Sequence, residues 1–348
     1  MTATRTTARG VFAITDVLLA QVDPADAQPL ASVAGVPGGG LVVSGDKEAK
    51  MAVRYLRGRG FQQLVLPDRQ RYKGRNRLPA AHPFDSNWIS WQRDLGLPVI
   101  MPDAGYVAAT DLNGLQTVLR NSAAIPGAIA PLALANWWLY GAGLRLLLTE
   151  LAQVSVPIAV IIEHAGDPFG ANRILQGLLA VIRSGIPVIP LRCDTSAVGL
   201  LAHGALAAAY GGTTALRHLY PQRAGGGGGT PGKESALWSA GLALHYLDLL
   251  HDAVMATPTA PRWRCDCQIC RGARLDRLAI ATTYEVRQHN LACVLDLRHQ
   301  LVALPAGGDR VRTWSSWCRR GEEEHAAANT SPVFLRVPPA LRHWQAAG

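Results

Sequence analysis

Short apolar runs alternate with helix-like segments along most of the chain. Each run is rich in Val, Ile, Leu and Ala, and each is followed by residues whose apolar positions recur at helical spacing. This alternation is typical of βαβ units whose strands form a parallel sheet. The predicted strands lie within residues 41–46, 62–68, 98–103, 127–134, 157–163, 187–194 and 205–220. Seven or eight such strands favour an α/β fold of the (β/α)8 TIM-type barrel class, with a doubly wound open sheet as the alternative.

The regions outside this alternation predict a chain of four parts. Residues 1–40 are rich in Ala, Thr, Pro and Gly and are interpreted as an N-terminal lead-in to a barrel body over 41–256, which ends in one helix over 234–256. A small zinc-binding subdomain and its following helix are expected over 257–304, and an irregular tail over 305–348. The glycine-rich stretch 224–233 is interpreted as a hinge, because Glu234 follows Lys233 where a phosphate-binding loop requires Ser or Thr.

Composition favours a cytoplasmic protein. The first twenty residues contain no basic start followed by a clean apolar run, so we expect no signal peptide. The apolar segment 130–148 is interrupted by Asn136 and Arg145, which argues against a membrane span. Six cysteines, three of them clustered, fit a reducing compartment and a metal site better than a disulfide framework.

The charge balance favours a polyanionic partner. The net charge is +9 and the pI is about 9.6, and basic proteins bind nucleic acid by neutralising phosphates and releasing counterions. The alternative is a genome that uses Arg freely, since the chain has few lysines. Alternating cations on one loop strengthen the nucleic-acid interpretation. These candidate nucleic-acid-binding residues are Arg69, Arg71, Lys73, Arg75 and Arg77.

Acidic residues end several predicted strands: Asp46, Asp68, Asp103, Glu163 and Asp194. In a barrel the C-terminal ends of the strands surround one mouth, where active sites form. Asp also caps helices well, so at any one position capping is an equally good explanation. Five acids at five strand ends suggest chemistry on a sugar or recognition of a base.

A cluster of thiols predicts a metal site. Cys265, Cys267 and Cys270 form a C-x-C-x-x-C pattern, and His289 follows on the next predicted helix. Thiolate sulfur and imidazole nitrogen are the ligands that tetrahedral zinc prefers, so we expect one structural zinc ion per chain. The alternative is three thiols that bind nothing. Cys193, Cys293 and Cys318 are expected to be ordinary free thiols.

The same stretch resembles the zinc subdomain of the tRNA-guanine transglycosylases. The resemblance is carried by RCDCQIC and the later RQHNLACVLDLRHQL; it is strongest over 261–300 and traceable back to about residue 40. It implies a barrel with a zinc site that exchanges a base at C1′ of a nucleoside. Such chemistry needs a carboxylate to form a covalent glycosyl-enzyme, a second carboxylate to move protons, and a third acid to read guanine.

The resemblance also implies roles for particular residues. Asp68 occupies the place of the family's general base, although the following Ser-Gly-Gly is missing. Asp103 resembles the base-recognising aspartate, and Tyr106 is available to stack on the base. Glu163 lies where the tRNA enzymes keep a glutamine.

The main departure from the family concerns the nucleophile. Arg217 falls where the tRNA enzymes carry that aspartate. Asp194 is the best substitute because it ends a strand and is followed by Thr195 and Ser196, which can donate hydrogen bonds to it. Arg217 and His218 would then face a phosphate or the base.

Loss of the tRNA enzymes' motifs with retention of their zinc subdomain points to the DNA transglycosylases, which insert 7-deazaguanine bases. A base in duplex DNA must be flipped out before its C1′ is reached, so the loops 69–77 and 224–233 would hold the strand. The expected partners are DNA, a free 7-deazaguanine base, and either a second copy or helper proteins that open the duplex. The alternatives are a tRNA-guanine transglycosylase, a non-catalytic zinc-containing nucleic-acid-binding paralogue, or a metabolic barrel enzyme.

Overall fold

Eight parallel strands form the centre of the molecule, which we describe from a computed structural model covering residues 14–222, 233–329 and 333–348. They form two four-stranded sheets with the orders β3-β2-β1-β8 and β4-β5-β6-β7. One isolated parallel bridge connects Cys193, after β7, with Tyr210 of β8, and another connects Pro79, in the loop after β3, with Tyr106 of β4. The strands are β1 (Val17–Val22), β2 (Gly39–Ser44), β3 (Leu64–Asp68), β4 (Tyr106–Val107), β5 (Ala130–Ala135), β6 (Ile158–Glu163), β7 (Val188–Pro190) and β8 (Ala207–Gly211).

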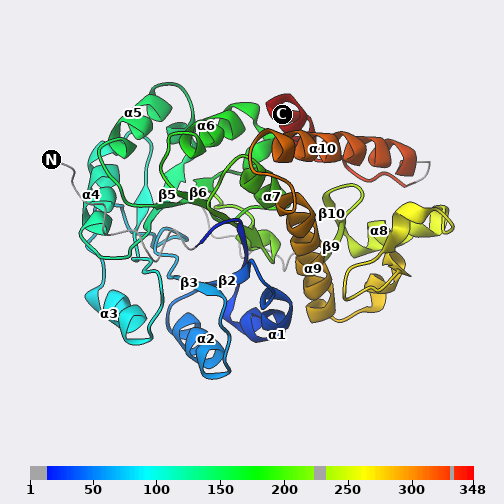
Figure 1. The fold of residues 1–348 in the computed structure, drawn as a ribbon, viewed down its shortest axis with the longest axis horizontal. Coiled ribbons are helices and arrows are strands. Elements are labelled where there is room, and N and C mark those ends of the chain that lie inside the picture. Colours follow the sequence, from blue (N-terminus) through cyan, green and yellow to red (C-terminus); the bar gives the residue numbers. More distant parts are fainter. Residues whose placement is uncertain (1–13, 223–232, 330–332) are drawn as a thin grey trace.

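Helices follow the strands in alternation and lie around the outside of them (Figure 1). They are α1 (Pro24–Ala34), α2 (Lys47–Gly58), α3 (Ser86–Asp94), α4 (Leu112–Ala123), α5 (Gly141–Leu151), α6 (Asn172–Ile182) and α7 (Ser196–Ala202). A later helix, α9 (Thr283–Val302), contacts α1, α7 and β1. The cysteine-containing segment is therefore inserted between β8 and a helix that packs against the start of the fold.

Burial explains why these segments fold as they do. All six residues of β2 and of β5 are buried, as expected for strands covered on both faces. In α2, Ala49, Val53 and Leu56 are buried on one face while the charged positions face solvent. The side chain of Asp85 accepts a hydrogen bond from the backbone N–H of Asn87 at the start of α3 (2.9 Å), an N-cap that sets where the helix begins.

The prediction that residues 1–40 are a lead-in to the barrel is partly wrong, because β1 and α1 lie within this range. β1 is central in its sheet and pairs with both β2 and β8. The run is hard to recognise because Gln21 interrupts it. Pro24 at the first turn of α1, which suits a helix start, resembles linker composition in the sequence.

Two further segments differ from the sequence prediction. Residues 98–103 form only the isolated bridge between Ile100 and Ala128, and the strand β4 follows a few residues later. Residues 234–256 form an antiparallel hairpin, β9 (Ser235–Trp238) and β10 (Ala243–Tyr246), before helix α8 (Leu247–Ala256). The side chain of Asn290 on α9 accepts from the N–H of Leu237 (2.7 Å) and donates to the carbonyl of Ser235 (2.8 Å). These long-range bonds favour a strand where local spacing indicates a helix.

The C-terminal segment is helical and not irregular. It contains α10 (Gly308–Ala328) and α11 (Ala340–Ala347), which pack against each other, and α10 also contacts α7. Trp314 and Trp344 are buried in this contact. In the cysteine-containing segment, β11 (Arg264–Cys265) pairs with β12 (Ala273–Arg274). Of the predicted glycine-rich hinge, residues 224–232 lie outside the described residues. Among the described helices, none has the length and apolarity needed to cross a bilayer.

Candidate functional site

The cysteine cluster is a buried group of sulfur and nitrogen donors. Cys265 lies in β11, Cys267 and Cys270 lie on the turn that follows, and His289 lies on α9. The Nδ1 atom of His289 is 3.8 Å from the Sγ of Cys265, 3.5 Å from that of Cys267 and 3.2 Å from that of Cys270. Two ligands on one tetrahedral zinc ion, bound at about 2.3 Å (S) and 2.1 Å (N), lie about 3.6 Å apart. The sequence-predicted donors are therefore close enough to share one metal ion.

The orientation of His289 supports this use. Its Nε2 lies 2.9 Å from the carbonyl oxygen of Leu237, so Nε2–H donates to that oxygen and Nδ1 is the ring nitrogen that is left to face the sulfurs. Metal-bound histidines ordinarily have such a second hydrogen bond, which fixes the ring. Hydrogen bonds from Cys265, Cys270 and Cys293 lower the pKa of the Cys267 thiol far below its usual range. A thiolate and an oriented imidazole are the forms that bind metals.

Cys293 belongs to this cluster, contrary to the expectation of an ordinary free thiol. Its Sγ lies 3.6 Å from the Sγ of Cys265, and the donor atoms of Cys265, Cys267, His289 and Cys293 all lie within 4.8 Å of one another. Cys293 follows His289 by one helical turn, which places both side chains on one face of α9. The H-x-x-x-C spacing was the sequence signal that could have found it. A buried cluster that can hold a metal ion therefore has five candidate donors.

Asp68 is at the centre of a second buried network, at the C-terminal ends of the strands. Its Oδ2 accepts hydrogen bonds from Gln21 Nε2 (3.0 Å), Ser44 Oγ (3.3 Å) and the Tyr72 hydroxyl (2.6 Å). The backbone N–H of Gln70 donates to Oδ1 (3.0 Å). Burial raises the pKa of Tyr72 well above its usual value, so this hydroxyl keeps its proton and donates it. Donors from β1, β2 and the chain after β3 thus converge on one carboxylate.

Arg192, which sequence reasoning missed, completes this network. It has a backbone φ of 57°, which side-chain-bearing residues rarely adopt, and its side chain is fully buried. Its Nε donates to the Tyr72 hydroxyl (3.0 Å), and its Nη2 lies 3.9 Å from Asp68 Oδ2 without a hydrogen-bond partner among the described residues. Strained backbone that holds a buried charge is found preferentially at functional sites. The only sequence signal was one arginine in an apolar strand segment.

The other strand-end acids are engaged by the arginine-rich loop. Arg69 contacts Asp46 (3.0 Å), Asp85 (2.6 Å) and Asp103 (2.8 Å). Arg71 also contacts Asp103 (2.8 Å), whose side chain is fully buried. Two of the predicted strand-end acids, Asp46 and Asp103, are thereby paired with the loop that follows β3, together with Asp85 at the start of α3.

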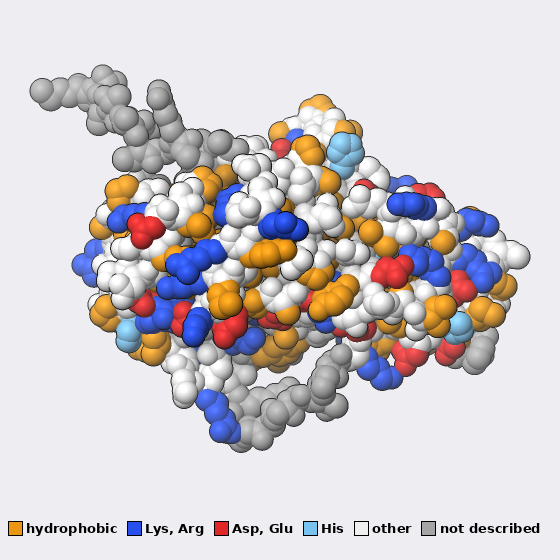
Figure 2. Space-filling view, turned by 90° about the horizontal axis from the view of Figure 1, so that it is seen from below, with side chains coloured by type: hydrophobic (Ala, Val, Ile, Leu, Met, Phe, Trp, Pro, Cys, Tyr) orange, Lys and Arg blue, Asp and Glu red, His pale blue; other side chains and the backbone are white. Residues whose placement is uncertain are grey.

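Glu163 is engaged in the same way. Its carboxylate accepts from Arg77 (2.6 Å) and from the hydroxyl of Tyr106, and the Arg77 guanidinium stacks 3.7 Å above the Tyr106 ring. Burial, and next the bond to Glu163, raise the pKa of Tyr106 above its usual value. Of the predicted nucleic-acid-binding residues, Arg69, Arg71 and Arg77 therefore contact acids of the site. Lys73 and Arg75 are exposed, and Figure 2 shows basic and acidic side chains interspersed on the face that it displays.

Asp194 lies in a different environment from Asp68. Its carboxylate accepts from the backbone N–H of Ser196 (2.8 Å), the first residue of α7. Burial, and next the charge of Asp194, raise the pKa of Asp167 to about 8. The Ser196 hydroxyl accepts from Trp344 on α11 (3.1 Å), and the Thr195 hydroxyl donates to the carbonyl of Leu242 (3.0 Å). Neither hydroxyl donates to Asp194, and its contacts are on the side covered by the C-terminal helices.

The side chains of Arg217 and His218 contact different parts of the structure. Arg217 contacts Ser235 Oγ (3.3 Å) at the start of the β9 hairpin. His218 is buried; burial, followed by the charges of His164 and Arg192, lowers the pKa of its imidazole to about 4. His218 is thus near the Asp68–Arg192 network, whereas Arg217 reaches the hairpin.

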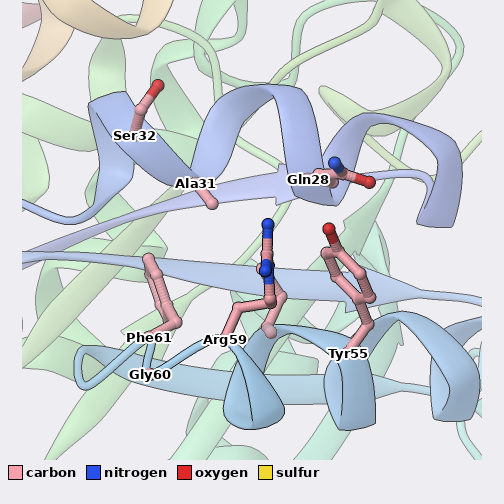
Figure 3. A pocket seen from close by; sticks show the side chains of 8 residues that line it. Gln28, Ala31, Ser32, Tyr55, Arg59, Gly60 and Phe61 are labelled. Atoms are coloured by element: carbon pink, nitrogen blue, oxygen red, sulfur yellow. The ribbon is translucent and has the colours of Figure 1, made fainter.

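A surface hollow of about 330 Å³ lies away from these strand ends, between α1 and α2. Figure 3 shows Tyr55 and Arg59 pointing toward α1 across it, with Phe61 at one side. It contains none of the sequence-predicted site residues.

The chain was compared with known proteins. No protein-family model matches it, and no curated protein matches it. A solved structure, the N-acetylneuraminic acid (sialic acid) synthetase from Leptospira borgpetersenii serovar Hardjo-bovis in complex with citrate, is similar over 90% of this chain and 91% of its own. The identity is 12% and the TM-score is 0.37.

Proposed function

We propose that this chain is a base-exchange transglycosylase that replaces guanine in DNA with a 7-deazaguanine base, built on a (β/α)8 barrel. The parallel pairing within both sheets, the contacts between β7 and β8, and the bridge from the loop after β3 to Tyr106 support one closed barrel. In such a barrel, side chains at the C-terminal ends of the strands share one mouth. Six free thiols in the chain suit a reducing cytoplasm.

The observation that carries this proposal is the environment of Asp68. Gln21, Ser44, Tyr72 and the N–H of Gln70 all donate to it, and Arg192 lies 3.9 Å away. Such an arrangement fixes the orientation of the carboxylate, as a glycosidic nucleophile requires. We therefore assign the nucleophile to Asp68 instead of Asp194, whose carboxylate accepts the backbone N–H of Ser196 at the start of α7.

The reaction then has two displacement steps. An Asp68 oxygen attacks C1′, the C1′–N9 bond breaks, and N9 of the departing guanine receives a proton from an acid of the site. The incoming base gives its N9 proton to the same acid and attacks C1′, which releases Asp68. Glu163 is our candidate for this acid: Tyr106 orients its carboxylate, and Arg77 must release it so that it can take up the proton that it then gives to N9.

Access of a base requires movement of the loop after β3. Asp103 can read a guanine edge only when Arg69 and Arg71 release it, since both contact its buried carboxylate. A DNA phosphate is a suitable replacement partner for these arginines. Lys73 and Arg75, which are exposed on the same loop, are the residues that we propose meet the phosphate backbone first.

For the metal centre we propose one structural zinc ion held by Cys265, Cys267, Cys270 and His289. The three sulfurs lie 3.2–3.8 Å from Nδ1, on the lone-pair side of the ring. Cys293 Sγ lies 3.6 Å from Nδ1 and 3.9 Å from Nε2, which places it beside the ring and not in front of Nδ1. A ligand that shares a metal with Nδ1 would be more than about 4.5 Å from Nε2 at ordinary bond lengths.

The test is incorporation of labelled base. Purified protein would be incubated with radiolabelled guanine or 7-cyano-7-deazaguanine, together with either plasmid DNA or bulk tRNA. The proposal predicts label in DNA. Label in tRNA alone would show the tRNA-guanine transglycosylase, and label in neither would contradict base exchange.

One alternative has a specific observation in its favour. The pairing of Asp103 with Arg69 and Arg71, and of Glu163 with Arg77, occupies the groups that would read and protonate a base. This arrangement fits a non-catalytic zinc-containing nucleic-acid-binding paralogue. Such a protein would bind DNA in a gel-shift assay but would incorporate no label under any condition.

A further inference from the structure

Cys293 is a fifth donor beside a metal site that needs four. Its Sγ is 3.6 Å from the Sγ of Cys265, and its position beside the His289 ring makes it the donor left over by the four-ligand set proposed above. Redox-responsive cysteines are often placed next to a second cysteine that can resolve the oxidised sulfur, as the short Cys265–Cys293 distance would allow.

A groove gives small molecules access to this pair. A hollow of about 430 Å³ has Cys265, Cys267 and Cys293 in its wall, together with Trp238, Asp296 and His299. The three thiols keep only 8%, 4% and 3% of their surface exposed. This exposure admits a small oxidant and excludes a bulky one.

We propose that Cys265 and Cys293 form an oxidisable pair, through which hydrogen peroxide dismantles the metal centre. The Cys265 thiolate attacks one peroxide oxygen, which gives a sulfenic acid and hydroxide and breaks the sulfur–metal bond. The Cys293 thiol then attacks the sulfenic sulfur, which forms the disulfide and releases water. The two thiol sulfurs are oxidised, the peroxide is reduced, and the metal ion leaves a site that has lost one of its ligands.

The geometry favours this pair over the other thiols. Cys293 is not needed by the metal, so it is available to resolve the sulfenic acid while Cys267 and Cys270 remain coordinated. The two sulfurs must approach by about 1.5 Å to reach disulfide bonding distance. They come from different elements, β11 and α9, so the crosslink would tie the subdomain to α9 after the metal has left.

The experiment uses the full, zinc-loaded chain treated with hydrogen peroxide. Zinc release would be followed with a chromogenic chelator, and the crosslink would be identified by peptide mass mapping. We expect zinc release together with loss of two hydrogen masses and a Cys265–Cys293 peptide, and reversal on addition of dithiothreitol and zinc. A purified chain that binds no metal, or oxidation that joins Cys267 to Cys270, would overturn the proposal.

Variants separate this role from metal binding. Cys293→Ser should keep about one zinc ion and release it at least about tenfold more slowly, because the resolving thiol is gone. Cys193→Ser and Cys318→Ser remove buried thiols outside the cluster and should leave the release rate unchanged. Loss of zinc in Cys293→Ser, or release at the parental rate, would contradict the proposal. These readouts do not depend on base exchange, so the two proposals fail independently.

Discussion

Arg69 and Asp103 form an ion pair of 2.8 Å between the loop after β3 and a fully buried carboxylate. The same guanidinium reaches Asp85 and Asp46, so one side chain connects three acids. The basic loop is therefore part of the interior of the site, and only some of its cations face solvent.

Removal of Arg69 should destabilise the fold. Arg69→Ala leaves Asp85 and Asp103 with fewer compensating charges, and breaking a partly buried pair costs about 2 to 3 kcal/mol in the free energy of unfolding. Arg75→Ala, which changes an exposed residue of the same loop, should cost less than about 0.5 kcal/mol. Urea unfolding measures both; equal effects would argue against the structural role of Arg69.

The difference between paired and exposed cations of this loop should also appear in DNA binding. Lys73→Ala and Arg75→Ala should each reduce by about one the slope of log affinity against log salt concentration, because each removes one phosphate contact. Arg77→Ala should leave this slope nearly unchanged, since Arg77 is bound to Glu163. Fluorescence anisotropy over a salt series makes the comparison. A larger loss for Arg77→Ala than for Arg75→Ala would show that the loop binds DNA through its interior cations.

Buried histidines should make stability depend on acidity. His245 Nε2 lies 3.2 Å from His325 Nε2, and burial, then His325, lowers the pKa of His245 to about 3. Above pH 6.5 His245 is neutral in both the folded and the unfolded chain, so it contributes no pH dependence. Between pH 6.5 and 3 the unfolded chain binds a proton that the folded chain does not. The free energy of unfolding therefore decreases by about 1.4 kcal/mol for each unit by which the pH is lowered.

The variant His245→Gln tests this prediction. It should reduce the slope of unfolding free energy against pH, between pH 6.5 and 4, by the contribution of one proton. Burial also lowers the pKa values of His203 and His218 to about 4, so part of the slope should remain. His82→Gln, at an exposed histidine, should leave the whole profile unchanged. Unfolding free energies that are flat over this range would contradict the account.

Removal of the metal should lower the stability of the fold around α9. Cys267→Ser and His289→Gln should lose zinc and several kcal/mol of stability, because metal binding is coupled to folding. Asn290→Ala is the matched control, since it breaks two hydrogen bonds to β9 next to His289 without removing a donor. It should cost about 1–3 kcal/mol and keep the zinc. Elemental analysis and urea unfolding on the same samples distinguish the two outcomes.

Local patterns predicted most of the repeating units. Apolar runs identify β2, β3, β5, β6, β7 and β8, because strands buried on both faces need continuous apolar side chains. The C-x-C-x-x-C spacing identifies three donors because a tight turn must place them close together. Gln21 hides β1, since the residue that interrupts the pattern is the one that contacts Asp68.

Features that depend on distant contacts were not predictable from spacing. Arg192 becomes notable only when β7 is placed beside Tyr72 and Asp68. The pair formed by Arg69 and Asp103 joins two loops. The sequence alone does not show this pair, so the loop 69–77 is interpreted from it as an exposed basic surface. The β9 hairpin reads as a helix because its partner, Asn290, lies far along the chain.

Base exchange by two aspartate variants tests the central claim most directly. Asp68→Asn and Asp194→Asn would be incubated with labelled 7-cyano-7-deazaguanine and plasmid DNA, after circular dichroism has confirmed folding. The account predicts that Asp68→Asn loses at least about 10³-fold in rate while Asp194→Asn keeps most of its activity. Full exchange by Asp68→Asn, or loss confined to Asp194→Asn, would contradict it.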